Sequence, residues 1–165
     1  MSDSQILQNI VNLQIKAMQD SIIVYKNIIA SISQESSKLK LAKGGWSILE
    51  VVCHLSDYEN IFLSRLDVVV KHEKPNLPVR TSELEARAQS KYPDKNLAKS
   101  FLEFETSRKK SINYIKQINP HDLTRQGIHP IYGNLSLVEL ITRFSSHDIN
   151  HLKQITNILK EHNEI

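Results

Sequence analysis

The spacing of apolar residues along the chain predicts a helical protein. Over residues 4–33, 47–70, 96–118 and 136–161 an apolar side chain recurs every three or four positions, which is the period of one helix face. A shorter helix is predicted over residues 82–89. We therefore expect an all-α fold of long amphipathic helices. In the first of them, the predicted buried face consists of Ile6, Ile10, Leu13, Ala17, Val24, Ile28 and Ile32.

Local sequence marks two of the helix starts. Ser47 and Glu50, and likewise Ser136 and Glu139, have the spacing of a capping box, in which a serine hydroxyl and a glutamate carboxylate bind the first amide groups of a helix. Every glycine and every proline lies outside the four long segments. Since both residue types disfavour helix interiors, this distribution supports the predicted boundaries.

The connections between the long helices constrain how they pack. Each helix would be about 33–45 Å long, so the helices can lie side by side in a bundle. Residues 34–46, 71–95 and 119–135 separate them, and these stretches are long enough for a crossover in place of a simple up-down-up-down order. No repeat or second domain is visible, so we expect a single four-helix bundle domain over residues 1–165.

The composition excludes several classes of protein. The chain has 4 Gly, 5 Pro and 1 Cys. One cysteine rules out an internal disulfide framework and a Cys-x-x-Cys zinc ribbon, and we expect this residue, Cys53, to be a buried packing thiol. So few glycines leave no phosphate-binding glycine loop, and so few turn-forming residues disfavour a β-sandwich or barrel.

Charge and hydropathy limit the expected partners. Lys and Arg number 21 against 18 Asp and Glu, but the cations are dispersed and not interleaved with aromatic residues, so we expect no nucleic-acid partner. Apolar runs are no longer than three residues, far below the roughly 20 that span a bilayer. No secretory leader is visible at the N-terminus. We expect a cytoplasmic protein that does not bind a membrane.

His147 and His151 form the motif most suggestive of chemistry. They are four residues apart on the last predicted helix, so their imidazoles lie one turn apart on the same face. The apolar stripe that passes through Leu140 and Phe144 to Ile155 includes both positions, and two buried imidazoles are costly without partners. A metal ion would satisfy both rings at once.

His54 is the candidate for a third ligand. It lies between apolar neighbours in the second long helix, at a depth that could match the histidine pair. Three histidines leave coordination positions open, as in catalytic metal sites. We expect a divalent cation, Zn or Ni first, with Fe, Co or Mn as alternatives, because imidazole suits several of these metals. The competing interpretation is that each histidine is a hydrogen-bonded core residue.

Other residues are weaker candidates. His129 and Tyr132 lie in the loop before the last helix, from which either could overhang the site and contact a substrate. Asp148 is expected beside the site or on the helix surface, because it is one methylene shorter than the glutamate of an HExxH protease and no downstream ligand follows it. Arg108 is predicted on an exposed helix face, although an arginine among apolar residues could also bind an anionic group.

Two blocks of sequence resemble the DinB-like superfamily of bacterial four-helix bundles. Residues 45–55 are similar to that family's Trp-Ser-x-x-Glu-x-x-x-His-Leu segment, and residues 129–155 contain Tyr-Gly-Asn-Leu-Ser-Leu and His-Asp-Ile-Asn-His-Leu. The resemblance implies an up-down-down-up bundle with a long crossover between the second and third helices. It also matches His54, His147 and His151 to the family's metal ligands.

The resemblance implies a choice of functions. Some relatives are bacillithiol- or mycothiol-dependent S-transferases, in which the metal converts a low-molecular-weight thiol into a thiolate that attacks a small electrophile in stress response or detoxification. Our first hypothesis is such a thiol-dependent S-transferase with a small-molecule substrate. One alternative is a metal-dependent hydrolase that activates water at the same site. The other is a non-catalytic metal- or ligand-binding bundle, and a homodimer is expected in either case.

Overall fold

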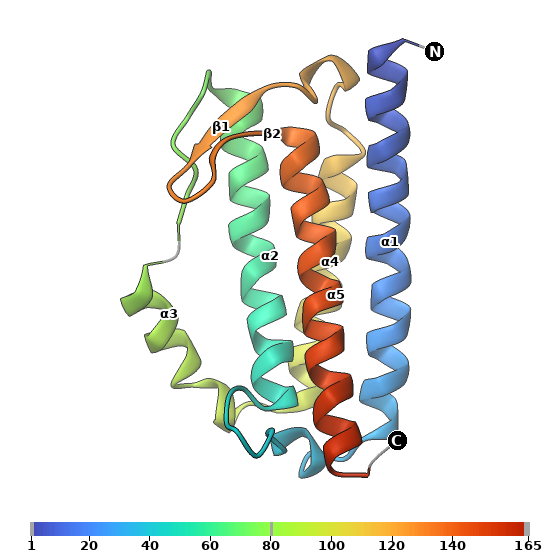
Figure 1. Ribbon diagram of the computed structural model, residues 1–165, viewed down its shortest axis with the longest axis vertical. Helices are drawn as coiled ribbons and strands as arrows, with labels where there is room; N and C mark the ends of the chain where they lie inside the picture. The colour runs from blue at the N-terminus through green and yellow to red at the C-terminus, as the bar shows by residue number, and fades with distance from the viewer. Residues whose placement is uncertain (1, 80, 164–165) are drawn as a thin grey trace.

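Four long helices make up most of the structure, a computed structural model that describes residues 2–79 and 81–163 (Figure 1). The predicted segments are confirmed as helices to within a few residues, and the short helix α3 begins and ends where the sequence predicted it. Helices and strands follow the order α1 (Asp3–Ser31), α2 (Ile48–Lys71), α3 (Ser82–Gln89), α4 (Leu97–Ile115), β1 (Gln126–His129), β2 (Gly133–Ser136) and α5 (Leu137–Glu161).

Both predicted capping boxes are present. The Ser47 hydroxyl accepts a hydrogen bond from the Glu50 backbone amide, and the Glu50 carboxylate accepts one from the Ser47 amide at 2.7 Å. Ser136 and Glu139 make the same exchange at the start of α5. These caps fix where the two histidine-bearing helices begin, because they satisfy amide groups that lack partners within the helix.

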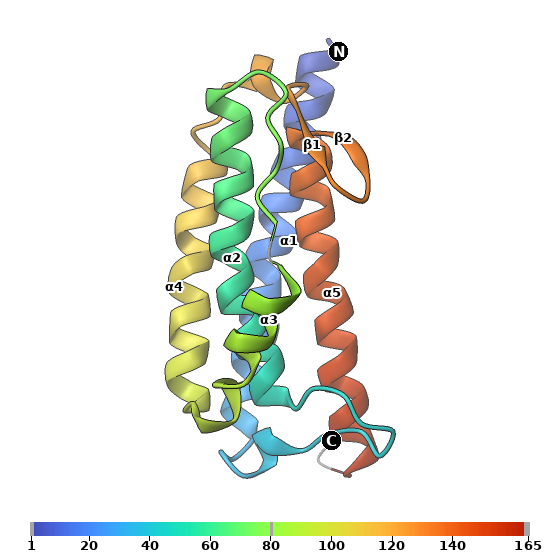
Figure 2. The same ribbon diagram turned by 90° about the vertical axis from the view of Figure 1, so that its left-hand side faces the viewer.

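Each long helix packs against two others, with α2 and α1 both lying between α4 and α5. In Figure 1 the chain runs downward through α1 and α5 and upward through α2 and α4. The connection from α2 to α4 therefore returns along the length of the bundle, and α3 lies on this return, on the outside of α2 (Figure 2). The histidine-bearing helices α2 and α5 are direct neighbours.

The core consists of two apolar clusters, one toward each end of the bundle. On α2, for example, Phe62 and Leu66 belong to one cluster and Leu49 and Val52 to the other. Between the clusters the helices contribute buried polar side chains to a central layer. These are Glu59 from α2, Arg108 and Ser111 from α4, and Asp148 from α5.

The predicted buried face of α1 is only partly correct, because Ile28 and Ile32 pack against the core as partly buried residues while other members of the set are exposed. Leu13 is 66% exposed and Ile6 is 45% exposed, although the prediction placed both in the core. The helix carries apolar residues on two overlapping stripes, and the side that meets α4 and α5 is the one that also holds Met18 and Tyr25. The Tyr25 hydroxyl donates to the backbone carbonyl of Asp148 at 2.7 Å. The buried residues of α1 are Val11, Ile15, Met18, Tyr25 and Ile29.

The connection before α5 contains an antiparallel β-hairpin that the all-α prediction missed. Gln126 pairs with Ser136 at one end of the hairpin and His129 with Gly133 at the other. Ile128 also exchanges backbone hydrogen bonds with the segment after α2, to Pro75 and from Leu77. A strand of four residues places only two side chains on each face, so it leaves no periodic signal in the sequence.

None of the helices in the described part of the chain combines the length and the apolarity needed to cross a membrane.

Candidate metal centre

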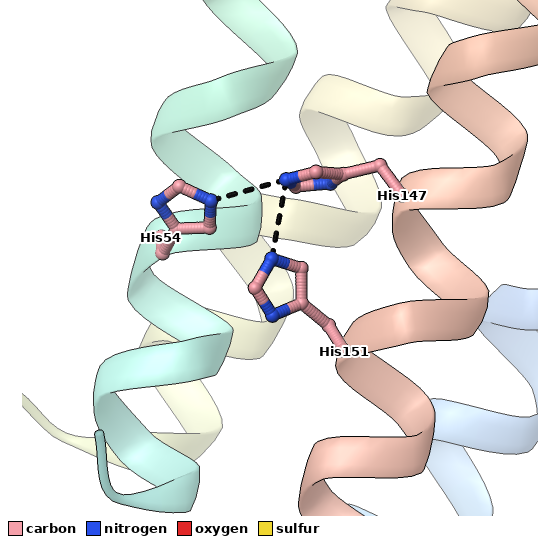
Figure 3. Close-up of side chains that lie close together, drawn as sticks. All are labelled: His54, His147 and His151. Carbon is pink, nitrogen blue, oxygen red and sulfur yellow. Dashed lines mark hydrogen bonds between the residues drawn. The ribbon is translucent and has the colours of Figure 1, made fainter. Parts of the chain in front are cut away.

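Three histidines from two helices converge at one point. His54 projects from α2, and His147 and His151 project from α5, so that their rings face one another (Figure 3). The Nε2 atom of His147 lies 3.2 Å from Nε2 of His54 and 3.1 Å from Nε2 of His151. His54 is buried, and the other two are partly buried. The structure thus brings together the three residues that the sequence singled out.

The separations fit a single cation. Tetrahedral zinc holds imidazole nitrogens at about 2.0–2.1 Å, which places two of them about 3.3 Å apart. One ring nitrogen from each of the three histidines lies within 4.8 Å of the other two. Hydrogen bonds alone cannot satisfy this arrangement, because Nε2 of a neutral imidazole offers either one hydrogen or one lone pair, and that of His147 faces two neighbours.

Gln154 sets the tautomer of His151. Its Oε1 lies 3.1 Å from Nδ1 of His151, and an amide oxygen only accepts, so we assign the proton to Nδ1. The lone pair of His151 is then on Nε2 and points toward His147. Among the described residues, no group hydrogen-bonds to the buried Nδ1 atom of His147. The Nε2 lone pair of His151 is thus assigned toward the centre, and the orphaned Nδ1 of His147 leaves that ring's Nε2 as its one polar atom with neighbours.

Aromatic rings hold the imidazoles from both sides. Trp46, just before α2, stacks parallel to His151 at 6.1 Å between ring centroids and lies 4.5 Å from the ring of His54. On the other side Tyr58 stacks on His147 at 4.2 Å, and Phe144 lies beyond Tyr58 at 5.8 Å. These contacts restrict ring rotation and so keep the nitrogens aimed at a common point.

Burial keeps two of the rings neutral. Desolvation, followed by the charge of His151, lowers the pKa of His147 from 6.5 to about 4. Burial also lowers the pKa of His151, although the hydrogen bond to Gln154 and the charge of Asp148 oppose this. At neutral pH both side chains are thus in the form that binds a metal.

A cavity of about 400 Å³ adjoins the centre, with His147 in its wall. Both loop candidates line it: His129 is buried, whereas Tyr132 is 55% exposed. The backbone amides of Ile131 and Tyr132 donate to Nδ1 of His129 at 3.2 and 3.4 Å, which assigns the ring proton to Nε2. Two arginines, Arg65 from α2 and Arg143 from α5, complete the charged part of the wall.

The structure places Arg108 and Asp148 in the interior. Arg108 is fully buried, so the prediction of an exposed face is wrong; of the two positions predicted for Asp148, the helix surface is excluded because it is 2% exposed, and its charge acts on His147 and His151 from beside the site. Arg108 donates to both carboxylate oxygens of Asp148, at 2.5 and 2.8 Å, and also to Glu59. In the sequence, Arg108 is an arginine among apolar residues of a helix. This pattern is compatible both with a buried ion pair and with an exposed cation, so the sequence did not distinguish the two.

Cys53 is fully buried, as predicted, and its thiol lies 3.4 Å from the Ser100 hydroxyl. Burial raises the pKa of this thiol, although the hydrogen bond to Ser100 opposes the change. The protein's own thiol is therefore protonated and away from the cavity, and it does not line the cavity wall.

The fold and the site together define a four-helix bundle with a three-histidine centre. The family model of the DinB superfamily matches residues 24–155. The chain belongs to the DinB superfamily, as the two sequence blocks suggested.

Relatives and solved structures agree with this assignment. A protein of Oceanobacillus iheyensis, provisionally named a metal-dependent hydrolase, is 25% identical over 160 residues that cover 96% of this chain and 91% of the relative. A Bacillus mycoides protein with the same provisional name is 22% identical over 154 residues. These residues cover 93% of this chain and 87% of the relative.

The structure of YfiT from Bacillus subtilis, described as a probable metal-dependent hydrolase with an unusual four-helix bundle topology, superposes with a TM-score of 0.84. The two share 15% identity, over 99% of this chain and 90% of YfiT. A DinB-like protein from Bacillus cereus matches with a TM-score of 0.51 at 16% identity, over 91% of this chain and 86% of that one. At these identities the likeness shows the fold.

Proposed function

We propose that this protein is a metal-dependent enzyme of the thiol S-transferase type. The observation that carries the proposal is the convergence of three Nε2 atoms beside a cavity whose wall contains no carboxylate among the described residues. Hydrolysis by activated water commonly uses a carboxylate as general base, whereas a thiolate attacks without one. The provisional names of the relatives support dependence on a metal.

His54, His147 and His151 would hold a divalent cation, Zn or Ni first, with Fe, Co or Mn as alternatives. With such a cation bound, the pKa of a coordinated thiol would fall far enough for the thiolate to form at neutral pH. Gln154 maintains the tautomer of His151 that such binding requires. Trp46 and Tyr58 hold the rings in place.

The proposed transfer needs no reactant besides the thiol and the electrophilic substrate. A low-molecular-weight thiol gives up its proton to solvent, its sulfur forms a bond to the electrophilic carbon of the second substrate, and the leaving group departs with the electron pair of the broken bond. His129 and Tyr132 face the same cavity, and the proton on Nε2 of His129 is available to donate to the substrate or leaving group. We propose these two as substrate contacts.

The experiment is a conjugation assay on tag-free protein. We expect turnover of a model electrophile, such as chlorodinitrobenzene, that requires both an added thiol and the bound metal. The triple variant His54→Ala, His147→Ala, His151→Ala should lose it, while His121→Ala, at an exposed position, should keep it. A triple variant that retained full activity would contradict the proposal.

Hydrolysis is the second candidate, because it is the activity in the relatives' provisional names. The same assay separates the two: a hydrolase turns over ester or amide substrates without any thiol. A non-catalytic bundle would bind the cation and turn over neither class of substrate. A homodimer and a cytoplasmic location remain predictions.

A further inference from the structure

The wall of the cavity next to His147 carries two guanidinium groups. Arg143, an exposed residue of α5, lies with its guanidinium carbon 4.2 Å from the ring centroid of Tyr132. Arg65, a half-buried residue of α2, lies 5.8 Å from the ring centroid of Tyr58. Stacking on an aromatic face orders the guanidinium of Arg143 and leaves its N–H groups at the edge, whereas Arg65 is held by hydrogen bonds of Nε and Nη1.

Neither arginine has a carboxylate partner in the described part of the chain. Arg65 donates Nε to the Pro78 carbonyl at 2.9 Å and Nη1 to the Tyr58 hydroxyl at 3.2 Å, so its partners are neutral. Glu139 lies one helical turn before Arg143, but its carboxylate accepts from the Ser136 amide and hydroxyl in the capping box. The salt bridges among the described residues involve neither Arg65 nor Arg143.

The charges of the two arginines act on another residue of the cavity wall. The pKa of His129, whose ring lies 4.7 Å from that of Tyr132, is lowered first by burial and then by the charges of Arg65 and Arg143. The polar groups that line the rest of the cavity are neutral, Thr142 and Asn150 among them. Glu139 interacts electrostatically with Arg143, but neither arginine forms a salt bridge with a described residue and the cavity wall holds no carboxylate among these residues. Such a partly enclosed cavity favours an anionic occupant.

We propose that this cavity binds an oxyanionic group of the substrate, a carboxylate or a phosphate, between Arg143 and Arg65. Guanidinium groups bind both oxyanions through paired N–H donors. A group held there lies in the cavity that His147 also lines, so it would orient the rest of the molecule toward the three histidines. The identity of this ligand as the substrate rests on the proposed function; the anion site itself does not.

The direct test is anion binding, measured without turnover. Inorganic phosphate is titrated into the metal-loaded protein at constant ionic strength, and the backbone amides of Tyr132 and Asn150 are followed by NMR. We expect saturable shifts in the wild type and binding about 10-fold or more weaker in Arg143→Gln. Lys153→Gln removes the same charge from an exposed site on the same helix and should bind phosphate like the wild type.

Arg65→Gln is the second variant. Arg143→Gln is the safer test, because the exposed Arg143 side chain makes no hydrogen bond to another described residue, whereas Arg65 bonds Pro78 and Tyr58. Equal phosphate binding by the wild type and Arg143→Gln would overturn the proposal. So would binding that is lost in His147→Ala but kept in Arg143→Gln, because the anion would then sit on the metal.

Turnover then identifies which substrate carries the anion. One arm compares mercaptopropionate with neutral mercaptoethanol, and the other compares a carboxylated chloronitrobenzene with a neutral one. A preference for the anionic member in either arm that disappears in Arg143→Gln supports the proposal, and its absence from both arms contradicts the assignment to the substrate. If no thiol transfer occurs, the proposed function fails while the phosphate titration still decides the anion site.

Discussion

Arg108 of α4 and Asp148 of α5 form a two-point ion pair at the centre of the bundle, one residue along the chain from His147. Arg108 also bonds Glu59 of α2, which in turn accepts from the Ser111 hydroxyl at 2.6 Å. The network therefore ties together α2 and α5, the two helices that carry the histidines. Because two parallel hydrogen bonds tolerate little sliding, the ion pair fixes the height of α5 against α4.

Replacing Arg108 with methionine should destabilise the protein strongly. The change leaves the carboxylates of Glu59 and Asp148 buried without their cation, and breaking a buried pair in this way costs about 3–5 kcal/mol. The free energy of unfolding from urea denaturation measures this loss. Lys109→Met is the matched control, since Lys109 is 68% exposed and its salt bridge is with Glu105, and it should change stability by about 1 kcal/mol or less. Similar losses for both variants would contradict the assigned role.

Gln154→Leu should weaken metal binding without unfolding the protein. The leucine cannot accept from Nδ1 of His151, so the ring can move its proton to Nε2 and withdraw the lone pair from the centre. Loss of such an outer partner typically lowers metal affinity about 10–100-fold. Competition with a chromophoric chelator measures the affinity. Asn157→Leu, an exposed position of the same helix, should bind metal as tightly as the wild type.

The stability of the metal-free protein should fall as the pH drops from 6.5 to 4. The pKa of His147 is about 4 in the folded protein and about 6.5 in the unfolded chain, so over this window the unfolded state binds the additional proton. The stability is fully present above pH 6.5, and the loss by pH 4 is on the order of 3 kcal/mol. Urea denaturation at a series of pH values measures it. His147→Gln should flatten the pH dependence, and an equally steep profile in that variant would assign the effect elsewhere.

Gly127→Ala should loosen the hairpin that presents His129. A Cβ atom at Gly127 would lie 2.4 Å from Cδ2 of Leu77 and 2.8 Å from Cγ2 of Val69, both in the buried core. Overpacking of this kind costs about 1–3 kcal/mol. Gly133→Ala provides a contrast, because its Cβ meets no atom within 4 Å and only its φ of +71° disfavours alanine. In hydrogen exchange, Gly127→Ala should expose the Ile128 amide, which donates to Pro75 at 2.8 Å, and unchanged protection would contradict this account.

The sequence predicted the helices and the histidine triad because both depend on periodic spacing. The capping boxes at Ser47 and Ser136 set the starts of α2 and α5, and the apolar stripe of α5 carried His147 and His151 inward. The contact of His54 with this pair could be predicted only from the similar positions of the three residues along their two helices. The spacing of residues within one helix gives no information about which helix packs beside it.

Features that depend on tertiary neighbours were not predictable in the same way. Arg108 looks like a surface cation until the facing carboxylates of Glu59 and Asp148 are known. The buried side of α1 could not be chosen between two overlapping apolar stripes, because the choice depends on which helices flank it. Gln154 and Arg143 gave no signal, since an amide and an arginine on a polar helix face are common without any role.

The central claim is that His54, His147 and His151 form one metal site, and calorimetric titration of tag-free, metal-depleted protein with Zn²⁺ and Ni²⁺ tests it most directly. The account predicts one equivalent bound per chain, lost or weakened at least about 100-fold in each of His54→Ala, His147→Ala and His151→Ala, and unchanged in His121→Ala. A wild-type protein that binds neither cation, or a His54→Ala variant that binds them as tightly as the wild type, would contradict it.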